Sequence, residues 1–599
     1  MSDPTADQAN EITYISGVTG QGTVASQAFA SWNGDTPATY STFSYQAKWG
    51  PASAGAGATV SYAFAAASNW SAAEKQAFAT AMHLWSDVAN ISFVEAGATS
   101  AQLTLTRAHD GTASGGINRL YPGAEGSATL GTAIKAAVAI DTSVAGFGPI
   151  GGSASAYGGY PWMTLEHEIG HAIGLGHAGA YDEDGRTTDD YAVNGGYDSR
   201  LYSIMSYHDV SSVRIYPTTP MLLDVAAAQR LYGLPASSPL SSGGQVFGFH
   251  SNIQGDTAAF YDFSVNTTPY ITIWDGGSNN TLDLSGFSVG STVSLVDGTL
   301  NSVGTYYQNL GIAYGTRIDT VIGGSGGDRL SANANSDVVM GGSAADTLVG
   351  GTGNDHIYGN TSMSVQGSTD GGDDIQTGGG NDYVNGNAGD DIITAASGDN
   401  RLYGGAGRDR IIASNGNNHI NGNLGEDYIE VHTGNNVIFG GQGNDSIELF
   451  DGNNVVSGDA GDDHIRAQSG FAIMTGGPGS DSFLFSQSPV DRPGALAGYI
   501  DEITDFMPGA DRINIGGKSL TLLHDANGTV FSTVADARAD AQALISGHAG
   551  LLEAAAVQVG SDTYLFWGND FRGEVVDSAV RIDHVSAGDF TQASLSTSY

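Results

Sequence analysis

The sequence has no cysteine, few basic residues and no long apolar run. Zero Cys excludes disulfides, thiolate metal sites and cysteine nucleophiles. Only 21 Lys+Arg stand against 63 Asp+Glu, which gives a formal charge of −42. Nucleic acids and anionic membranes require basic patches, so this balance argues against both partners and favours a chain that binds cations. No stretch of 18 or more apolar residues is present, so no transmembrane span is predicted.

The composition changes along the chain, and the changes predict the domains. The first residues, MSDPTADQANEITY, lack the basic and apolar regions of a Sec signal peptide, so we expect export, if any, by another route. The predicted parts are an N-terminal segment and candidate propeptide (1–30), a mixed α+β domain (31–235), a β-rich lead-in (236–313), a repeat region (314–484) and a C-terminal cap (485–599).

Helix and strand signals alternate within the α+β domain. Ser71-Ala-Ala-Glu has the pattern of a capping box, which predicts that a helix begins there. Further helices are predicted over about 161–175 and 220–232. Alternating apolar residues predict strands at 59–64 and 103–106.

A nine-residue repeat is the most regular feature of the chain. It runs in unbroken register from Tyr314 to Leu484, which makes 19 units, and the strongest units read GGxGxDxUx. The eighth position is apolar in 18 of the 19 units, with Gln366 as the exception. The sixth position is Asp in 13 units and Asn in four, with Ser364 and Ala472 in the other two.

This repeat resembles the Ca²⁺-binding nonapeptide of RTX proteins, and the resemblance implies a parallel β-roll. Glycine-rich turns that require positive φ would alternate with short strands whose apolar side chain points inward. Two units would complete one coil, so residues 18 apart would stack at one edge, about 4.8 Å apart. A disordered acidic linker is the alternative, but it does not explain an apolar position kept in phase through the repeat.

Carboxylates stacked at this spacing repel one another unless a cation lies between them. Carboxylates and the carbonyls of glycine-rich turns are the ligands that Ca²⁺ prefers, so we predict several Ca²⁺ ions in the roll. The 18-residue period places ten candidate ligands at one edge: Asp319, Asp337, Asp355, Asp373, Asp391, Asp409, Asp427, Asp445, Asp463 and Asp481.

The other edge is predicted to differ. It carries the carboxylates of Asp328, Asp346 and Asp382, and then Asn400, Asn418, Asn436 and Asn454. An asparagine offers a carbonyl oxygen but no charge. We therefore expect Ca²⁺ to bind weakly or not at all at this edge beyond Asp382, where stacked asparagines could instead hydrogen-bond to one another.

Residues 167–177 read HEIGHAIGLGH and carry the candidate catalytic chemistry. His167 and His171 are four residues apart on the predicted helix, so both imidazoles lie on one face and can bind one Zn²⁺. Gly174 allows the chain to turn back, which brings His177 to the same metal. Glu168 is placed to hold a water as general base. Three protein ligands leave a coordination position open, as in catalytic zinc sites.

A second motif, Ser203-Ile-Met-Ser-Tyr207, follows the histidines and looks like the Met-turn of metzincins. With it, the chain resembles the serralysin family, which are secreted RTX zinc endopeptidases of Gram-negative bacteria. The resemblance runs from Trp32-Asn-Gly through both motifs and residues 220–233 to the end of the roll. It implies that Tyr207 is a switchable zinc ligand that stabilises the oxyanion, and that Met205 forms an apolar floor.

The chain departs from the family pattern at a few positions. The family implies a Ca²⁺ site ahead of the roll, with Asp275 as a ligand, but Asn280 stands where Asp is usual. Ala178 and His208 replace the usual Pro and Trp beside the zinc motifs. The roll is also longer than the family commonly carries.

We therefore predict a secreted, monomeric metalloendopeptidase that acts on extracellular proteins. The family implies export by a type I (ABC) exporter, which would read an uncleaved signal in 485–599. Residues 117–121 (INRLY) are a candidate substrate-binding edge strand. The main alternative is an RTX adhesin or S-layer-associated surface protein with a vestigial protease. An RTX lipase would need a G-x-S-x-G elbow between a strand and a helix, and no such pentapeptide is found.

Overall fold

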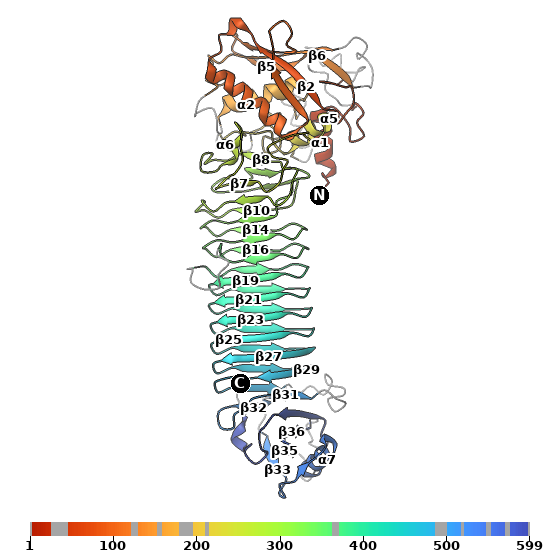
Figure 1. The fold of residues 1–599 in the computed structure, drawn as a ribbon, viewed down its shortest axis with the longest axis vertical. Helices are drawn as coiled ribbons and strands as arrows, with labels where there is room; N and C mark the ends of the chain where they lie inside the picture. The colour runs from red at the N-terminus through yellow and green to blue at the C-terminus, as the bar shows by residue number, and fades with distance from the viewer. Residues whose placement is uncertain are drawn as a thin grey trace. The chain divides into compact units, whose positions relative to one another are not determined.

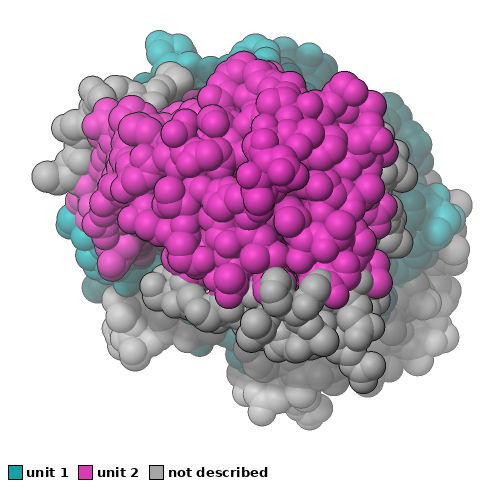
Figure 2. All heavy atoms as spheres, turned by 90° about the horizontal axis from the view of Figure 1, so that it is seen from below, with its two compact units in different colours: residues 1–322 teal, residues 323–599 magenta. Residues whose placement is uncertain are grey.

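The computed structural model describes residues 3–25, 46–120, 130–151, 159–178, 196–209, 215–361, 370–485, 500–516, 520–546, 553–568 and 575–596. The chain forms two compact units, residues 1–322 and 323–599, which Figure 2 distinguishes by colour. Each is described separately. Within the described residues, every helix is too short or too polar to cross a lipid bilayer.

A mixed sheet is the centre of the first unit. Its main path runs β1-β6-β4-β2-β3 with parallel pairs, and β5 lies antiparallel beside β6 at the edge. Both predicted strands are present, in β2 and β4. The bounds are β1 (Ala47–Lys48), β2 (Ala58–Phe64), β3 (Ile91–Glu95), β4 (Leu103–Arg107), β5 (Ala113–Leu120) and β6 (Gly131–Ile140).

Within the described residues, helices α1, α2, α4 and α5 belong to the same unit as this sheet, and Figure 1 labels three of them, α1, α2 and α5. The predicted capping box is confirmed at α2. Ser71 Oγ accepts from Glu74 N at 3.3 Å, and Glu74 Oε2 accepts from Ser71 N at 2.8 Å. The buried side chains of Phe78 and Trp85 anchor this helix in the core. The bounds are α1 (Ala6–Ser16), α2 (Ala72–Val88), α4 (Tyr160–Ala172) and α5 (Leu222–Tyr232).

The β-rich lead-in was predicted from composition, and it contains short strands and one short helix. Their inward side chains, such as Phe247, Ile271 and Leu282, are buried. The elements are β7 (Val246–Gly248), α6 (Ala258–Tyr261), β8 (Ile271–Ile273), β9 (Thr281–Asp283), β10 (Thr292–Ser294), β11 (Thr299–Asn301) and β12 (Leu310–Ile312). The first strand of the repeat region, β13 (Thr320–Ile322), follows in the same unit and pairs with β9.

The second unit contains a parallel roll of two sheets, drawn as the stack of green to blue strands in Figure 1. The eighth residue of each described unit points inward and is buried, from Leu330 to Phe483. One sheet comprises β14 (Arg329–Ser331), β16 (Thr347–Val349), β18 (Asp374–Gln376), β20 (Ile392–Ala395), β22 (Arg410–Ala413), β24 (Tyr428–Val431), β26 (Ser446–Leu449), β28 (His464–Ala467), β30 (Ser482–Phe485), β32 (Arg512–Ile515) and β38 (Leu595–Ser596).

The other sheet lies opposite and follows the same parallel order. It comprises β15 (Val338–Met340), β17 (His356–Tyr358), β19 (Tyr383–Ala388), β21 (Arg401–Ala406), β23 (His419–Leu424), β25 (Val437–Gln442), β27 (Asn453–Ala460), β29 (Phe471–Thr475) and β31 (Asp501–Ile503).

The predicted 18-residue stacking is wrong at one point. Thr347 of β16 pairs with Asp374 of β18, and His356 of β17 pairs with Tyr383 of β19, which are steps of 27 residues. The pairing of the described strands therefore passes over one nonapeptide at this point. The bypassed unit is the one that holds Ser364 and Gln366, and both residues lie outside the described part of the chain.

This step changes which aspartates share an edge. Asp346 N donates to Asp373 Oδ1 at 2.8 Å, and Asp355 N donates to Asp382 Oδ1 at 2.8 Å. The edge that we call the aspartate edge holds Asp328, Asp346, Asp373, Asp391, Asp409, Asp427, Asp445, Asp463 and Asp481. The asparagine edge holds Asp337, Asp355, Asp382, Asn400, Asn418, Asn436 and Asn454.

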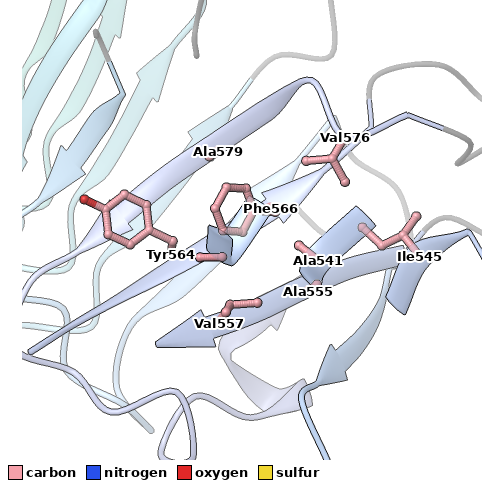
Figure 3. Close-up of a cluster of buried hydrophobic side chains, with 9 residues drawn as sticks. Ala541, Ile545, Ala555, Val557, Tyr564, Phe566, Val576 and Ala579 are labelled. Atoms are coloured by element: carbon pink, nitrogen blue, oxygen red, sulfur yellow. The ribbon is translucent and has the colours of Figure 1, made fainter. Parts of the chain in front are cut away.

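A cap follows the roll, and its apolar cluster is shown in Figure 3. Ala541 and Ile545 of the helix face Ala555, Val557 and Phe566 of the strands. The elements are β33 (Thr521–His524), β34 (Val530–Phe531), α7 (Val534–Ile545), β35 (Glu553–Val559), β36 (Asp562–Trp567) and β37 (Ser578–Ile582).

Candidate functional site

Helix α4 places the first part of the zinc motif, and a glycine turn places the rest. His167, Glu168 and His171 are all buried on α4. The helix ends at Ala172, and Gly174 then takes φ +101°. A Cβ at Gly174 would approach the carbonyl oxygen of Ala47 to within 3.0 Å, so only glycine fits this turn. The turn brings His177 back towards α4, as the sequence predicted.

The three imidazoles converge on one point. One ring nitrogen from each of His167, His171 and His177 lies within 4.8 Å of the other two. His167 Nδ1 donates to Ile204 O at 2.8 Å and His171 Nδ1 donates to Leu175 O at 3.0 Å. A carbonyl can only accept, so both Nδ1 atoms carry the proton and both Nε2 atoms present lone pairs.

The residues present fit a zinc ion. His171 Nε2 and His177 Nε2 are 3.1 Å apart. Two nitrogens bound to one tetrahedral zinc at about 2.0–2.1 Å lie roughly 3.3 Å apart. Burial lowers the pKa of His167 to about 4 and holds the pKa of His171 and His177 well below the ordinary value, so all three rings stay neutral. Neutral imidazoles with converging lone pairs are the donor set that zinc prefers.

The Glu168 carboxyl is buried beside the histidines. Burial raises the pKa of Glu168 to about 8, and a hydrogen bond from the Gly115 backbone opposes this shift. A Cβ at Gly115 would meet the carbonyl oxygen of Glu168 closer than 3.0 Å, so β5 packs its backbone directly against α4 here. A nearby divalent cation would favour the ionised carboxylate.

The Met-turn residues Met205 and Tyr207 lie near helix α4 and His177. Met205 is fully buried, and a Cβ at Gly170 would lie 2.8 Å from its sulfur, so this methionine packs against α4 at Gly170. The Tyr207 ring lies 4.6 Å from the ring of His177 and is half exposed. Partial burial and the nearby Glu168 raise the pKa of Tyr207 to about 12, so its hydroxyl keeps its proton.

Asp224 of α5 is a supporting residue that the sequence reasoning missed. Its buried carboxylate accepts hydrogen bonds from Ser203 Oγ at 2.5 Å, Ile204 N at 2.7 Å and Met221 N at 2.8 Å. Ile204 also carries the carbonyl that orients His167. An acidic residue within the apolar stretch LLDVAAAQRLY was the available signal.

The N-terminal helix supports the turn before His177. Gly176 N donates to Ile15 O at 2.8 Å, at the end of α1. Gln46 Nε2 donates to Ser16 O at 3.0 Å and also bonds Gly174 O. The candidate propeptide segment thus includes a helix that packs within the first unit.

The aspartate edge has the features of a cation ladder. Each Oδ1 accepts the backbone N–H of the preceding coil, as Asp409 Oδ1 does from Asp391 N at 2.9 Å. Within the described residues, the buried Oδ2 atoms of this edge from Asp346 onward accept no hydrogen bond. Beside Gly404, a Cβ would meet both Asp409 Oδ2 and the carbonyl of Gly422 closer than 3.0 Å. Carboxylate and carbonyl oxygens thus face one cradle, which fits Ca²⁺.

The candidate site ahead of the roll is different. Asn280 Nδ2 donates to Asp275 Oδ1 at 3.0 Å and to Arg317 O at 2.8 Å. The Arg317 guanidinium pairs with Asp319. An amide therefore accompanies the carboxylate of Asp275, and a guanidinium accompanies that of Asp319.

The ladder continues beyond the last predicted ligand. Asp481 N donates to Asp511 Oδ1 at 3.0 Å, and Asp505 accepts from the backbone N–H groups of Gly476 and Gly477 at 2.9 and 2.8 Å. Neither residue belongs to the nonapeptide frame, which ends at Leu484. The signal was a further Asp that precedes an apolar strand, in Asp511-Arg-Ile-Asn-Ile.

We predict that Asp224→Asn lowers the affinity for zinc by about tenfold or more. The amide nitrogen cannot accept the hydrogen bonds that fix Ile204, so the Nδ1 partner of His167 loses its place. Competition with a chromophoric chelator measures the affinity. Asp256→Asn, an exposed carboxylate, is the control and should not change it; equal affinity in Asp224→Asn would refute the positioning role.

We predict opposite pH dependences of roll stability with and without calcium. Burial first and neighbouring carboxylates second raise the pKa of Asp373 to about 8 and of Asp391 to about 9, whereas burial raises that of Asp427 to about 6. Unfolded Asp titrates near 3.9, so the ion-free fold binds more protons than the unfolded chain does. Its stability should be greatest below about pH 4 and should fall as pH rises through 6 to 9.

With saturating Ca²⁺ the trend should reverse, because protons compete with the ion for the same oxygens. Thermal unfolding of the full chain at pH 5 and pH 8, in excess chelator and in Ca²⁺, measures both trends by circular dichroism. A melting temperature in chelator that rises with pH would contradict the ladder.

Parts of the chain are similar to known proteins. Residues 236–524 match the family Peptidase M10 serralysin C terminal. The chain is 33% identical over 275 residues to Metalloprotease AprA of Pseudomonas entomophila (strain L48), covering 43% of this chain and 53% of that protein. It is 42% identical over 178 residues to Serralysin C of Dickeya chrysanthemi, covering 28% and 36%. The chain spans about half the length of the first of these curated relatives. Over residues 236–524 the chain therefore matches the serralysin family, and the curated relatives named here are similar to it over part of their length.

Proposed function

We propose that the chain is a secreted, zinc-dependent endopeptidase that hydrolyses extracellular proteins. The convergence of His167, His171 and His177, with the buried Glu168 carboxyl beside them, carries this proposal. The relatives named serralysin and metalloprotease support it. Tyr207, at 4.6 Å between ring centroids from His177, completes the set of groups that peptide hydrolysis requires.

A zinc ion held by the three histidines would lower the pKa of a water molecule and polarise the scissile carbonyl. Glu168 would take the proton of the attacking water and return it to the leaving amine. Tyr207 would donate a hydrogen bond from its hydroxyl to the negative charge that develops on the substrate oxygen. Burial of Glu168 keeps bulk water from competing for the proton that this residue moves.

The edge strand β5 is the proposed substrate platform. It pairs with β6 on one side only and packs its backbone against α4 at Gly115. An extended peptide could add to the other side of β5 by main-chain hydrogen bonds. The predicted segment 117–121 overlaps this strand, and Tyr121 lies outside the described residues.

The roll would bind Ca²⁺ after export. Free cytosolic Ca²⁺ is far below the roughly 10⁻⁴–10⁻³ M at which extracellular modules bind it. The aspartate edge would then repel itself, which favours an unfolded, export-competent chain until external Ca²⁺ orders the coils. The cap, with its own apolar core in α7, β35 and β36, would fold onto the ordered roll and include the signal for a type I exporter.

We predict that Glu168→Gln retains zinc binding and loses peptidase activity by about 10²–10⁴-fold or more, because the amide cannot accept the water proton. Casein hydrolysis with a zinc measurement on the same preparation tests this. Glu95→Gln, on an exposed position of β3, is the matched control. Activity that persists in Glu168→Gln would contradict the role of Glu168, whereas an inactive but zinc-loaded wild type would favour the surface-protein alternative.

We predict that Tyr207→Phe lowers kcat by about 10²-fold and changes KM little, because the hydroxyl donates mainly in the transition state. Steady-state kinetics on a fluorogenic peptide separate the two constants. Tyr307→Phe, at a tyrosine that is 76% exposed, controls for loss of a phenol elsewhere. A change confined to KM would argue that Tyr207 only binds substrate.

A further inference from the structure

The asparagine edge satisfies its side chains without an ion. Each Asn Oδ1 accepts the backbone N–H of the preceding coil, as each aspartate does on the opposite edge. The second side-chain atom, the amide nitrogen Nδ2, donates hydrogen bonds, which a carboxylate oxygen cannot do. Asn418 Nδ2 donates to Gly416 O at 3.2 Å and to Asn436 Oδ1 at 3.0 Å. Asn400 Nδ2 makes the matching bonds to Gly398 O at 3.1 Å and Asn418 Oδ1 at 3.1 Å.

The two edges also differ at the first position of the repeat, which lies five residues before the aspartate or asparagine. The aspartate edge carries Gly404 and Gly422 there, and a Cβ at either would crowd the Oδ2 of Asp409 or Asp427. The asparagine edge carries a side chain at every equivalent position beside the asparagines, and all four are fully buried: Ala395, Ala413, Val431 and Leu449. Their methyl and methylene groups take the place that the cradle leaves open on the other edge.

We infer that the asparagine edge from Asn400 to Asn454 binds no Ca²⁺, and that the amide nitrogen of each asparagine does there what the ion does at the aspartate edge. A carboxylate oxygen in the place of Nδ2 would need a cation between itself and the turn carbonyls, because neither can donate a hydrogen bond. An NH₂ group brings its own positive hydrogens and bonds the carbonyls directly. Each coil in this stretch then requires calcium at one edge only.

The same substitution occurs a second time, in the first unit. Asn280 stands in the lead-in where the aspartate would be expected, and its Nδ2 donates to the carboxylate of Asp275 and to the carbonyl of Arg317. An amide nitrogen again joins a side-chain oxygen to a backbone carbonyl, and here the side-chain oxygen belongs to a carboxylate. Two separate places in the chain therefore use one device.

Reciprocal variants at neighbouring coils test the inference, which rests on the proposed binding of Ca²⁺ at the aspartate edge. Asp409→Asn should lower the calcium bound by the full-length chain by about one ion and should raise its melting temperature in chelator by about 2–4 °C. Asn418→Asp should leave calcium unchanged and lower the melting temperature by a similar amount both in Ca²⁺ and in chelator. Calcium is counted by elemental analysis after equilibrium dialysis.

Two controls keep the test decisive. Asn435→Asp adds the same charge at an exposed position of the same edge and should change neither readout appreciably. Asn418→Ala removes the amide without adding charge, and it replaces Asn418→Asp if that variant does not fold; its calcium count should equal that of the wild type.

The results that would refute this inference differ from those that would refute calcium binding at the aspartate edge. Fewer ions in Asn418→Ala, or more ions in Asn418→Asp, would overturn the inference, since the edge would then be a calcium site. A wild-type chain that binds no calcium, or a count unchanged in Asp409→Asn, would refute the proposed aspartate-edge site instead. Peptidase activity enters neither readout.

Discussion

The roll depends on how the buried polar side chain at each edge of every coil finds hydrogen-bond partners or an ion. Strand spacing places the sixth residue of one coil about 4.8 Å from that of the next. One side-chain oxygen takes a backbone N–H in either case, as Asp409 and Asn418 both do. The remaining atom decides what the edge requires: an oxygen calls for a cation, whereas an amide nitrogen supplies donors itself. The first position of the repeat differs accordingly: it is glycine beside Asp409 and Asp427, and alanine, valine or leucine beside the asparagines.

The zinc site applies the same constraint at one point. Burial keeps the three imidazoles neutral, and carbonyls of Ile204 and Leu175 fix the Nδ1 protons of two of them. The lone pair on Nε2 of His171 then faces Nε2 of His177 at 3.1 Å, where a cation or a proton between the two nitrogens would be favourable. In both proposed metal centres, therefore, backbone groups orient the candidate ligands and a bound cation would complete the electrostatics. The scarcity of lysine and arginine leaves few side chains to compete for either role.

Local patterns predicted much of this, because their physical causes are local. The nine-residue period sets the inward position, and the four-residue spacing of His167 and His171 sets one helix face. The bypassed nonapeptide was not predicted, because a period counts units without saying which of them enter a coil. Its two departures, Ser364 and Gln366, were the only warning. Asp224 was missed for another reason: it acts on Ile204 from a separate helix, and contacts of that kind leave no spacing in the sequence.

If the roll folds on calcium as proposed, its two edges divide the requirements of a protein that would be ordered only where calcium is plentiful. Carboxylates at both edges would double the number of buried charges that each coil must compensate. Amides at both edges would leave order independent of calcium. With asparagine at one edge from Asn400 to Asn454, hydrogen bonds are available at any calcium concentration. The opposite edge, from Asp391 to Asp463, has buried Oδ2 atoms that accept no hydrogen bond and would keep the order conditional on the ion. The second side-chain atom at the sixth position, Oδ2 of aspartate or Nδ2 of asparagine, would therefore set how strongly the roll depends on calcium.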